Sequence, residues 1–281
     1  MKYAFIREHS KQFSIALMCE LFSISRSAYC TRSPSQQEQA NRQLDRQITV
    51  IYNQHKKRYG SPRITRELLA QNEKCSHTRV ARRMKEMGLV AVAKKKFKVT
   101  TDSEHNLPIY KNILSCDFST TGMNQKWACD ITYVHTKEGW LYLAVVIDLY
   151  SRAIIGWSMS NRMKKTLVCD ALMMALFKRK FPKNVIVHSD RGSQYCSGKY
   201  QNIIKDYRLV GSMSRKANCW DNAIAESFFH TLKVELIHES VYKTRKQARL
   251  SIFQYVEGYY NNRRKHSSIN YMTRYEAELA G

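Results

Sequence analysis

At residues 127–134 the chain reads Trp127-Ala128-Cys129-Asp130-Ile131-Thr132-Tyr133-Val134, and at residues 140–147 it reads Trp140-Leu141-Tyr142-Leu143-Ala144-Val145-Val146-Ile147. The first stretch alternates between two sets of side chains with a period of two, which is typical of a β-strand. The second stretch is almost continuously apolar, which predicts a strand buried on both faces. Lys137-Glu138-Gly139 indicates a turn between the two strands.

The sequence that follows extends this sheet. A third strand is predicted over residues 153–159, a helix over 167–177, a short fourth strand over 185–188 and another helix around 203–207. Three antiparallel strands followed by a helix, a strand and a helix predict a mixed α/β sheet.

The first hundred residues predict short helices instead. Leu44, Ile48 and Ile51 have helical spacing, and Pro62 marks the start of a helix whose buried stripe is Ile64, Leu68 and Leu69. Ser76 is expected to cap the next helix, which carries Val80, Met84 and Met87 and stops at Gly88. A short helix, a tight turn and a basic helix with Arg79, Arg82 and Arg83 predict a helix-turn-helix. A basic helical bundle with a solvated face stays as the alternative.

The charge of the chain indicates a polyanionic partner. Among 281 residues there are 47 Lys+Arg against 23 Asp+Glu, a net charge of +24. Residues 1–100 hold 21 Lys+Arg and 7 Asp+Glu, so most of this surplus lies in the first third. Nucleic acid is the leading candidate, and an anionic membrane surface is the weaker one. The chain lacks a long apolar run and a signal-peptide pattern, so we expect no membrane segment and a cytoplasmic location.

The eight cysteines do not predict a zinc site. No two of them are closer than eleven positions, so no Cys-x-x-Cys pair exists. Their scattered positions fit reduced thiols that serve as small hydrophobic residues.

Three acids could carry chemistry. Asp130 interrupts an otherwise apolar or hydroxylic strand, where a carboxylate is costly unless it is paired or bound to metal. Asp190 directly follows the fourth strand, and Glu226 shares one face of a predicted helix with His230 and Lys233. Three such carboxylates suit a pair of divalent cations, either Mg²⁺ or Mn²⁺, acting on a phosphodiester. For any one acid the alternative is an ordinary ion pair or cap, and Asp148 (a turn residue) and Asp221 (a helix cap) are interpreted in that way.

The spacing of these acids and the sequence motifs around them resemble those of a known family. Asp130 and Asp190 are 60 positions apart, and 35 residues separate Asp190 from Glu226. The strings Asp130-Ile131-Thr132-Tyr133, His188-Ser189-Asp190-Arg191-Gly192 and Glu226-Ser227-Phe228-Phe229 resemble the second-reading-frame transposases of the insertion-sequence group named after insertion sequence three. These belong to the retroviral-integrase-like proteins with a ribonuclease-H fold. The resemblance spans essentially the whole chain, including Tyr259-Tyr260-Asn261-Asn262-Arg263-Arg264-Lys265.

The resemblance implies a metal-dependent DNA strand transferase. Asp130, Asp190 and Glu226 would be its catalytic metal ligands for two ions, Mg²⁺ or Mn²⁺, and Lys233 would hold a DNA phosphate. Water would nick an element end, and the resulting 3′-hydroxyl would attack target DNA. The implied partners are double-stranded terminal inverted repeats, target DNA, further copies of the chain and an upstream reading-frame product or a frameshift fusion with it. The implied location is the bacterial cytoplasm, with the nucleoid when DNA is bound.

Four segments follow from these interpretations. Residues 1–105 are predicted as the all-α DNA-binding region, 106–122 as a linker, 123–240 as the ribonuclease-H-like catalytic core and 241–281 as a basic helical tail. Two further basic clusters are predicted to contact DNA, namely Lys94, Lys95 and Lys96, and Arg263, Arg264 and Lys265.

Two positions depart from the family's pattern, and two other functions stay open. Met123 and Arg274 each stand where a proline is usual, which bears on loop geometry rather than on the acids. The competing functions are a catalytically inert helix-turn-helix regulator and a ribonuclease-H-like nuclease that cleaves RNA. The three intact acids favour the transposase over the regulator.

Overall fold

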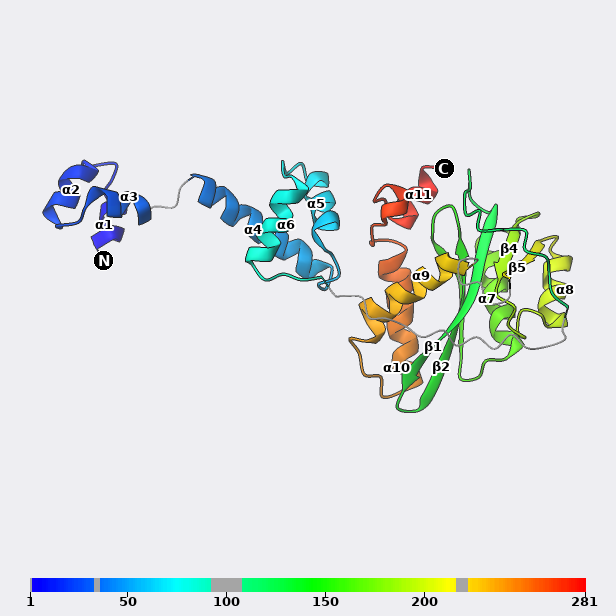
Figure 1. Cartoon of the computed structure of the whole chain (residues 1–281). Coiled ribbons are helices and arrows are strands. Elements are labelled where there is room, and N and C mark those ends of the chain that lie inside the picture. The colour runs from blue at the N-terminus through cyan, green and yellow to red at the C-terminus, as the bar shows by residue number, and fades with distance from the viewer. Residues whose placement is uncertain (1, 33–35, 92–107, 216–221) are drawn as a thin grey trace. The chain divides into compact units, whose positions relative to one another are not determined.

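A computed structural model of the chain describes residues 2–32, 36–91, 108–215 and 222–281 (Figure 1). The chain divides into two compact units, Met1–Ala91 and Val92–Gly281. None of the helices within the described ranges combines the length and the apolar composition that crossing a membrane requires.

Two clusters of helices make up the first unit. Helices α1 (Lys2–Glu8), α2 (Ile15–Leu21) and α3 (Arg26–Arg32) bury Ile6, Met18, Cys19 and Tyr29 together. Helices α4 (Gln36–Gln54), α5 (Ser61–Ala70) and α6 (His77–Glu86) bury a second set that includes Leu44, Ile48, Ile64, Leu68 and Val80.

The predicted boundaries of α5 and α6 are confirmed. Pro62 lies in the first turn of α5, where its missing N–H costs nothing. The Ser76 hydroxyl accepts a hydrogen bond from the Arg79 backbone N–H at 3.2 Å and so caps α6. Gly88 follows α6 with a φ of +66°. The prediction that Leu69 belongs to the buried stripe is wrong, because Leu69 is 44% exposed and Thr65 is buried in its place. Helix α5 therefore presents a narrower apolar stripe than predicted.

The second unit is built on a five-stranded sheet. Its strands are β1 (Lys126–Thr136), β2 (Gly139–Asp148), β3 (Ile154–Ser160), β4 (Ile186–Ser189) and β5 (Val210–Met213), in the order β3-β2-β1-β4-β5. The pairs β1–β2 and β2–β3 are antiparallel, whereas β1–β4 and β4–β5 are parallel. The mixed sheet is confirmed. Strand β5 was not predicted, because Val210-Gly211-Ser212-Met213 has no clear alternation and is strand only through its pairing with β4.

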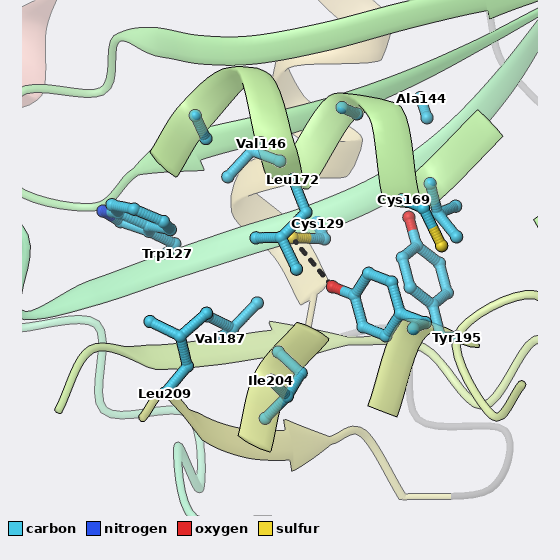
Figure 2. Packing of buried hydrophobic residues seen from close by; sticks show 14 of the residues in the cluster. Trp127, Cys129, Ala144, Val146, Cys169, Leu172, Val187, Tyr195, Ile204 and Leu209 are labelled. Atoms are coloured by element: carbon cyan, nitrogen blue, oxygen red, sulfur yellow. Dashed lines mark hydrogen bonds between the residues drawn. The ribbon is translucent and has the colours of Figure 1, made fainter. Parts of the chain in front are cut away.

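Helices cover both faces of this sheet. On one face, α7 (Lys165–Lys178) and α8 (Gly198–Asp206) pack against the sheet, and Figure 2 shows Trp127, Cys129 and Val187 of the strands packed with Leu172 and Ile204 of these helices. Gly156 permits this approach, because a Cβ there would lie 2.2 Å from the carbonyl oxygen of Ala171. The other face carries α9 (Ala223–Leu232), the π-helical turn η2 (Lys233–Ile237), α10 (Arg245–Phe253) and the π-helical turn η3 (Gln254–Tyr260).

The last forty residues belong to this second unit. They are helical, as predicted, but Ile252, Val256 and Tyr260 are buried in the core cluster that includes Leu143 and Phe228. The final elements are the 3₁₀ turn η4 (Ser267–Ile269) and α11 (Arg274–Leu279). The segment is therefore part of the second helical layer, and the four-part division of the chain stays a prediction.

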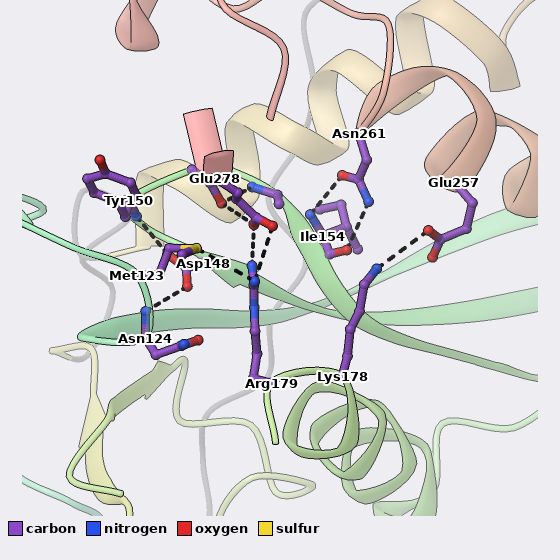
Figure 3. Close-up of polar contacts among 12 residues, drawn as sticks. Met123, Asn124, Asp148, Tyr150, Ile154, Lys178, Arg179, Glu257, Asn261 and Glu278 are labelled. Carbon is purple, nitrogen blue, oxygen red and sulfur yellow. Dashed lines mark hydrogen bonds and ion pairs between the residues drawn. The ribbon is translucent and has the colours of Figure 1, made fainter. Parts of the chain in front are cut away.

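Polar contacts fix α11 to the sheet layer. Figure 3 shows the Glu278 carboxylate bound to Arg179, whose Nη1 donates to Glu278 Oε2 at 3.1 Å. The Ser151 hydroxyl donates to the same carboxylate at 2.8 Å. Asn261 pairs with the backbone N–H and carbonyl oxygen of Ile154, both at 3.0 Å (Figure 3). These bonds satisfy polar groups at the start of β3 and hold the end of the chain in place.

The two positions that depart from the family's pattern have defined surroundings. The Met123 sulfur accepts a hydrogen bond from Arg179 Nη1 at 3.8 Å (Figure 3). Arg274 is the first residue of α11, a position that suits proline. Its side chain is buried over the Tyr260 ring, 3.8 Å from the ring centroid, and donates to the carbonyl oxygen of Arg264. Arginine here replaces backbone rigidity with a side-chain contact.

Candidate active site

Strands β1 and β4 bring two of the three acids together. The parallel pairing of these strands runs from Lys126 opposite Ile186 to Ala128 opposite His188. Asp130 of β1 and Asp190, which directly follows β4, each lie two residues beyond that last pair, so both acids lie at the same end of the paired strands. Helix α9, which carries Glu226, packs against β1. The sheet therefore presents Asp130 and Asp190 beside the helix of Glu226.

Backbone groups orient the two aspartates. Asp130 Oδ1 accepts a hydrogen bond from the Ile131 backbone N–H at 2.8 Å, and Asp190 Oδ1 accepts one from the Gly192 backbone N–H at 3.0 Å. A Cβ at Gly192 would lie 3.0 Å from Asp190 Oδ1, closer than a side chain ordinarily approaches. Gly192 therefore lets the chain turn tightly around the Asp190 carboxylate.

The charges around Asp130 are mutually repulsive. Burial raises the pKa of the Asp130 carboxyl group well above its ordinary value, and the negative charge of Asp190 raises it further. The hydrogen bond from Ile131 lowers this pKa, the charge of Glu226 raises it, and the charge of Lys233 lowers it. Asp190, Glu226 and Lys233 thus each act electrostatically on Asp130, with Asp190 the stronger of its two acidic neighbours.

The donor set fits a hard divalent cation. Carboxylate oxygens are the ligands that Mg²⁺ and Mn²⁺ prefer, and a cation would relieve the repulsion that raises the Asp130 pKa. Across the described part of the chain, no three His, Cys, Asp or Glu side chains already meet at the spacing of a metal site. Asp130 and Asp190 form the closer pair, whereas Glu226 is exposed on α9 and interacts more weakly. The Glu226 side chain would have to approach the pair to share a cation with it.

Lys233 lies where the helical face of Glu226 predicted it. It follows α9 directly, and its Nζ lies 5.1 Å from the centroid of the Tyr133 ring. Its positive charge also lowers the pKa of Asp130. Its contact with a DNA phosphate stays a prediction.

The three arginines of α6 have different surroundings. Arg83 binds Asp45 of α4, with Nε 2.8 Å from Oδ1, and it also pairs with Glu86. Arg79 donates to Asn41 Oδ1 at 2.9 Å. Arg82 is exposed. Of the three, Arg82 is therefore the best placed to contact DNA, while Arg83 connects α6 to α4.

The residues of the two predicted basic clusters also differ in their surroundings. The prediction that Arg264 contacts DNA is wrong. Arg264 is only 5% exposed, and its Nη2 lies 2.7 Å from Glu235 Oε1. A guanidinium held in the core by a buried carboxylate is not available to a phosphate. Arg263 is exposed and Lys265 is half-buried. Lys94, Lys95 and Lys96 lie outside the described residues.

The structure adds Asn222, which is next to the predicted cap residue Asp221 in the sequence; Asp221 itself lies outside the described residues. Asn222 precedes α9 but makes no side-chain capping bond. It is buried, and its Nδ2 donates to the carbonyl oxygen of Cys129 at 3.4 Å. Asn222 thus ties the start of the Glu226 helix to the residue before Asp130. Its place beside a predicted cap was the only signal in the sequence, because the contact spans 93 residues.

Comparisons with known proteins identify the domains and the family of the chain. Residues 120–219 and 208–273 match two family models, each described as an integrase core domain, and residues 38–97 match an HTH-like domain. The chain is 50% identical over 272 residues to the transposase InsF for insertion sequence IS3A of Escherichia coli strain K12, covering 95% of this chain and 94% of that protein. It is 42% identical over 255 residues to an uncharacterized 31 kDa protein of insertion element IS600 of Shigella sonnei, covering 90% of this chain and 94% of that protein.

A solved structure is also similar in part. The magnesium complex of the HTLV-2 integrase catalytic core domain aligns with a TM-score of 0.44 at 16% identity, covering 57% of this chain and 99% of that one. The family assignment rests on the sequence matches. In the sequence, an N-terminal helical region precedes a ribonuclease-H-like integrase core. The chain belongs to the IS3 family of insertion-sequence transposases, DDE-type nucleases and transferases that carry out DNA transposition.

Proposed function

We propose that the chain cleaves the ends of its own insertion sequence and joins the resulting 3′-hydroxyl to target DNA at the site formed by Asp130, Asp190 and Glu226. The observation that carries this proposal is the strand register, which sets Asp130 beside Asp190 while Glu226 and Lys233 act electrostatically on the same carboxyl group. Acids packed against one another destabilise the fold, and such an arrangement is typical of a functional site.

The three acids would hold the metal on which the integrase core family depends. One or two Mg²⁺ or Mn²⁺ ions bound there would activate the attacking oxygen and stabilise the leaving oxygen of the phosphodiester. Asp130 and Asp190 would supply ligands from backbone positions fixed by the sheet. Glu226 would complete the set from the exposed face of α9. Lys233 would bind a phosphate oxygen next to the scissile bond and so orient the strand.

The remaining partners follow from the same reaction. Transposition brings the two ends of one element together, so we propose that several copies of the chain assemble on the terminal inverted repeats. The N-terminal helices would bind those repeats through exposed cations such as Arg82. The reaction would take place on cytoplasmic, nucleoid DNA. An upstream reading-frame product, free or fused by frameshifting, would contribute further binding.

A strand-transfer assay on DNA carrying the element's ends tests the mechanism. With Mg²⁺ present, we expect Glu226→Gln to abolish both cleavage and joining, because it removes a proposed metal-binding carboxylate. Binding of the DNA ends should be retained, because the substitution only removes one negative charge from the exposed face of α9. Glu239→Gln is the matched control, because Glu239 is also exposed and lies beyond η2. The assay should be run with and without the upstream reading-frame product.

Three outcomes separate the candidate functions. Normal strand transfer by Glu226→Gln would contradict the proposed metal site. Binding without cleavage by the wild-type chain in both arms would favour the inert regulator. Faster cleavage of an RNA–DNA hybrid than of duplex DNA would favour the ribonuclease-H-like nuclease.

A further inference from the structure

Three exposed aromatic rings lie together on the hairpin of β1 and β2. They are Tyr133, His135 and Trp140, which we call the aromatic patch. Tyr133 is 38% exposed and Trp140 is 46% exposed. The Trp140 ring centroid lies 5.0 Å from that of Tyr133 and 5.1 Å from that of His135, in both cases edge to face. Large rings left this accessible on a strand are costly unless a partner covers them.

The pairing of the two strands places all three rings on one face. Tyr133 and His135 are two residues apart on β1, and His135 is paired with Trp140 of β2. The intervening residues point the other way, where Val134 and Leu141 are buried in the core cluster that includes Ala248 and Ile252 of α10. One face of the hairpin is therefore core, and the other presents the aromatic patch to solvent.

The aromatic patch adjoins the candidate active site at the edge of β1. Tyr133 lies three residues after Asp130, about 10 Å along the strand, so its side chain leaves the opposite face of β1. Lys233 connects the two, because its Nζ lies 5.1 Å from the Tyr133 ring centroid and its charge acts on Asp130. Strand β4 pairs with β1 only as far as Ala128, so it does not cover this part of β1.

We propose that the aromatic patch stacks unpaired bases of the DNA strand whose end lies in the active site. A duplex hides the faces of its bases, so only frayed or unpaired nucleotides can stack on Tyr133 or Trp140. The cation of Lys233 beside Tyr133 suits the phosphates that link such nucleotides. Stacked nucleotides rise about 3.4 Å each, so the aromatic patch is within a few nucleotides of the acids. This inference rests on the proposed action of the site on DNA.

Fluorescence of 2-aminopurine tests this stacking without any cleavage. The probe is a terminal inverted repeat with 2-aminopurine at each of its last three positions in turn, bound to the full chain in EDTA. For the wild type we expect quenching at one or more of these positions. Trp140→Ala and Tyr133→Ala should reduce the quenching and weaken the binding of frayed ends by roughly 5- to 150-fold, the range that loss of one stacked base gives. Trp140→Phe should retain most of both.

A variant at an exposed aromatic residue outside the aromatic patch serves as the control. Phe253→Ala should leave quenching unchanged, because Phe253 is also 46% exposed but lies on α10. Unchanged quenching in correctly folded Tyr133→Ala and Trp140→Ala variants would overturn the inference. So would loss of self-association in these variants with unchanged quenching, because the aromatic patch would then be an interface between copies of the chain. Failure of the catalytic proposal is seen separately, in the Glu226→Gln cleavage assay.

Discussion

The Arg264 guanidinium lies 2.7 Å from the Glu235 carboxylate, and both side chains are buried. Glu235 belongs to η2, directly after the helix that carries Glu226, and it also accepts a hydrogen bond from the Tyr255 hydroxyl at 2.8 Å. Arg264 follows η3 in the chain's last segment. This ion pair therefore joins the end of the chain to the segment that follows the helix of Glu226.

We expect Arg264→Ala to destabilise the second unit by about 3–5 kcal/mol, because it leaves the buried Glu235 carboxylate without its counter-charge. Arg263→Ala, next to it but exposed, should change the free energy of unfolding by less than about 0.5 kcal/mol. Urea unfolding of both variants measures the difference. Equal stability of the two would contradict the structural role of Arg264.

Divalent metal should stabilise the wild-type chain by relieving repulsion at Asp130. In EDTA, Asp130→Asn is expected to raise the melting temperature by about 2–4 °C for each kcal/mol of repulsion removed. Added Mg²⁺ should raise the melting temperature of the wild type and leave that of Asp130→Asn nearly unchanged. Asp170→Asn, an exposed acid on α7, serves as the control and should respond to Mg²⁺ like the wild type. An equal Mg²⁺ response in Asp130→Asn would place the metal elsewhere.

The attachment of α11 should weaken at low pH. Glu276 Oε2 accepts a hydrogen bond from the Thr273 backbone N–H at 2.7 Å, and this bond lowers the pKa of Glu276. Because the folded-state pKa is below the unfolded value, the stabilisation is present above the unfolded pKa of about 4.3 and is lost as the pH falls through the folded pKa. Because Glu276 is exposed, solvent screening should keep this contribution below about 1 kcal/mol.

Unfolding by urea between pH 6 and pH 3 measures this dependence. Glu276→Gln retains a side chain that can accept the same hydrogen bond, so its stability should fall less steeply with pH than that of the wild type. Parallel curves for the two proteins would show that Glu276 is not responsible.

In the first unit, Arg82 and Arg83 should behave differently on substitution. Arg82→Ala is expected to weaken DNA binding and to lower the slope of log K against log salt by about 0.9, the value for one lost phosphate contact. Arg83→Ala should instead lower the stability of this unit by about 1–2 kcal/mol, because it breaks the contacts with Asp45 and Glu86. Salt titrations of binding and thermal unfolding of both variants separate these roles. An unchanged salt slope for Arg82→Ala would exclude it as a phosphate contact.

The sequence pattern was sufficient to predict the elements whose apolar residues repeat at a fixed period or form a continuous run. Strands β1, β2, β3 and β4, and helices α4 to α8, were predicted because local hydrophobic periodicity reports which face each element buries. The stripe residue Leu69 and the strand β5 were not, since the width of a buried face and the pairing of a four-residue strand depend on the neighbouring elements. The three acids were recognised through their spacing and the motifs around them.

Only the tertiary structure decided how distant charges are used. The burial of Arg264 against Glu235 spans 29 residues, and the approach of Lys233 to Tyr133 spans two different elements. Nothing in the local pattern distinguishes Arg264 from the exposed Arg263 beside it. Composition and motifs alone therefore determined that this chain is a basic α/β protein, and they predicted three carboxylates as metal ligands. Which cations lie on the surface and which lie in the core was set by packing, because the environment of a charge depends on residues far away in the sequence.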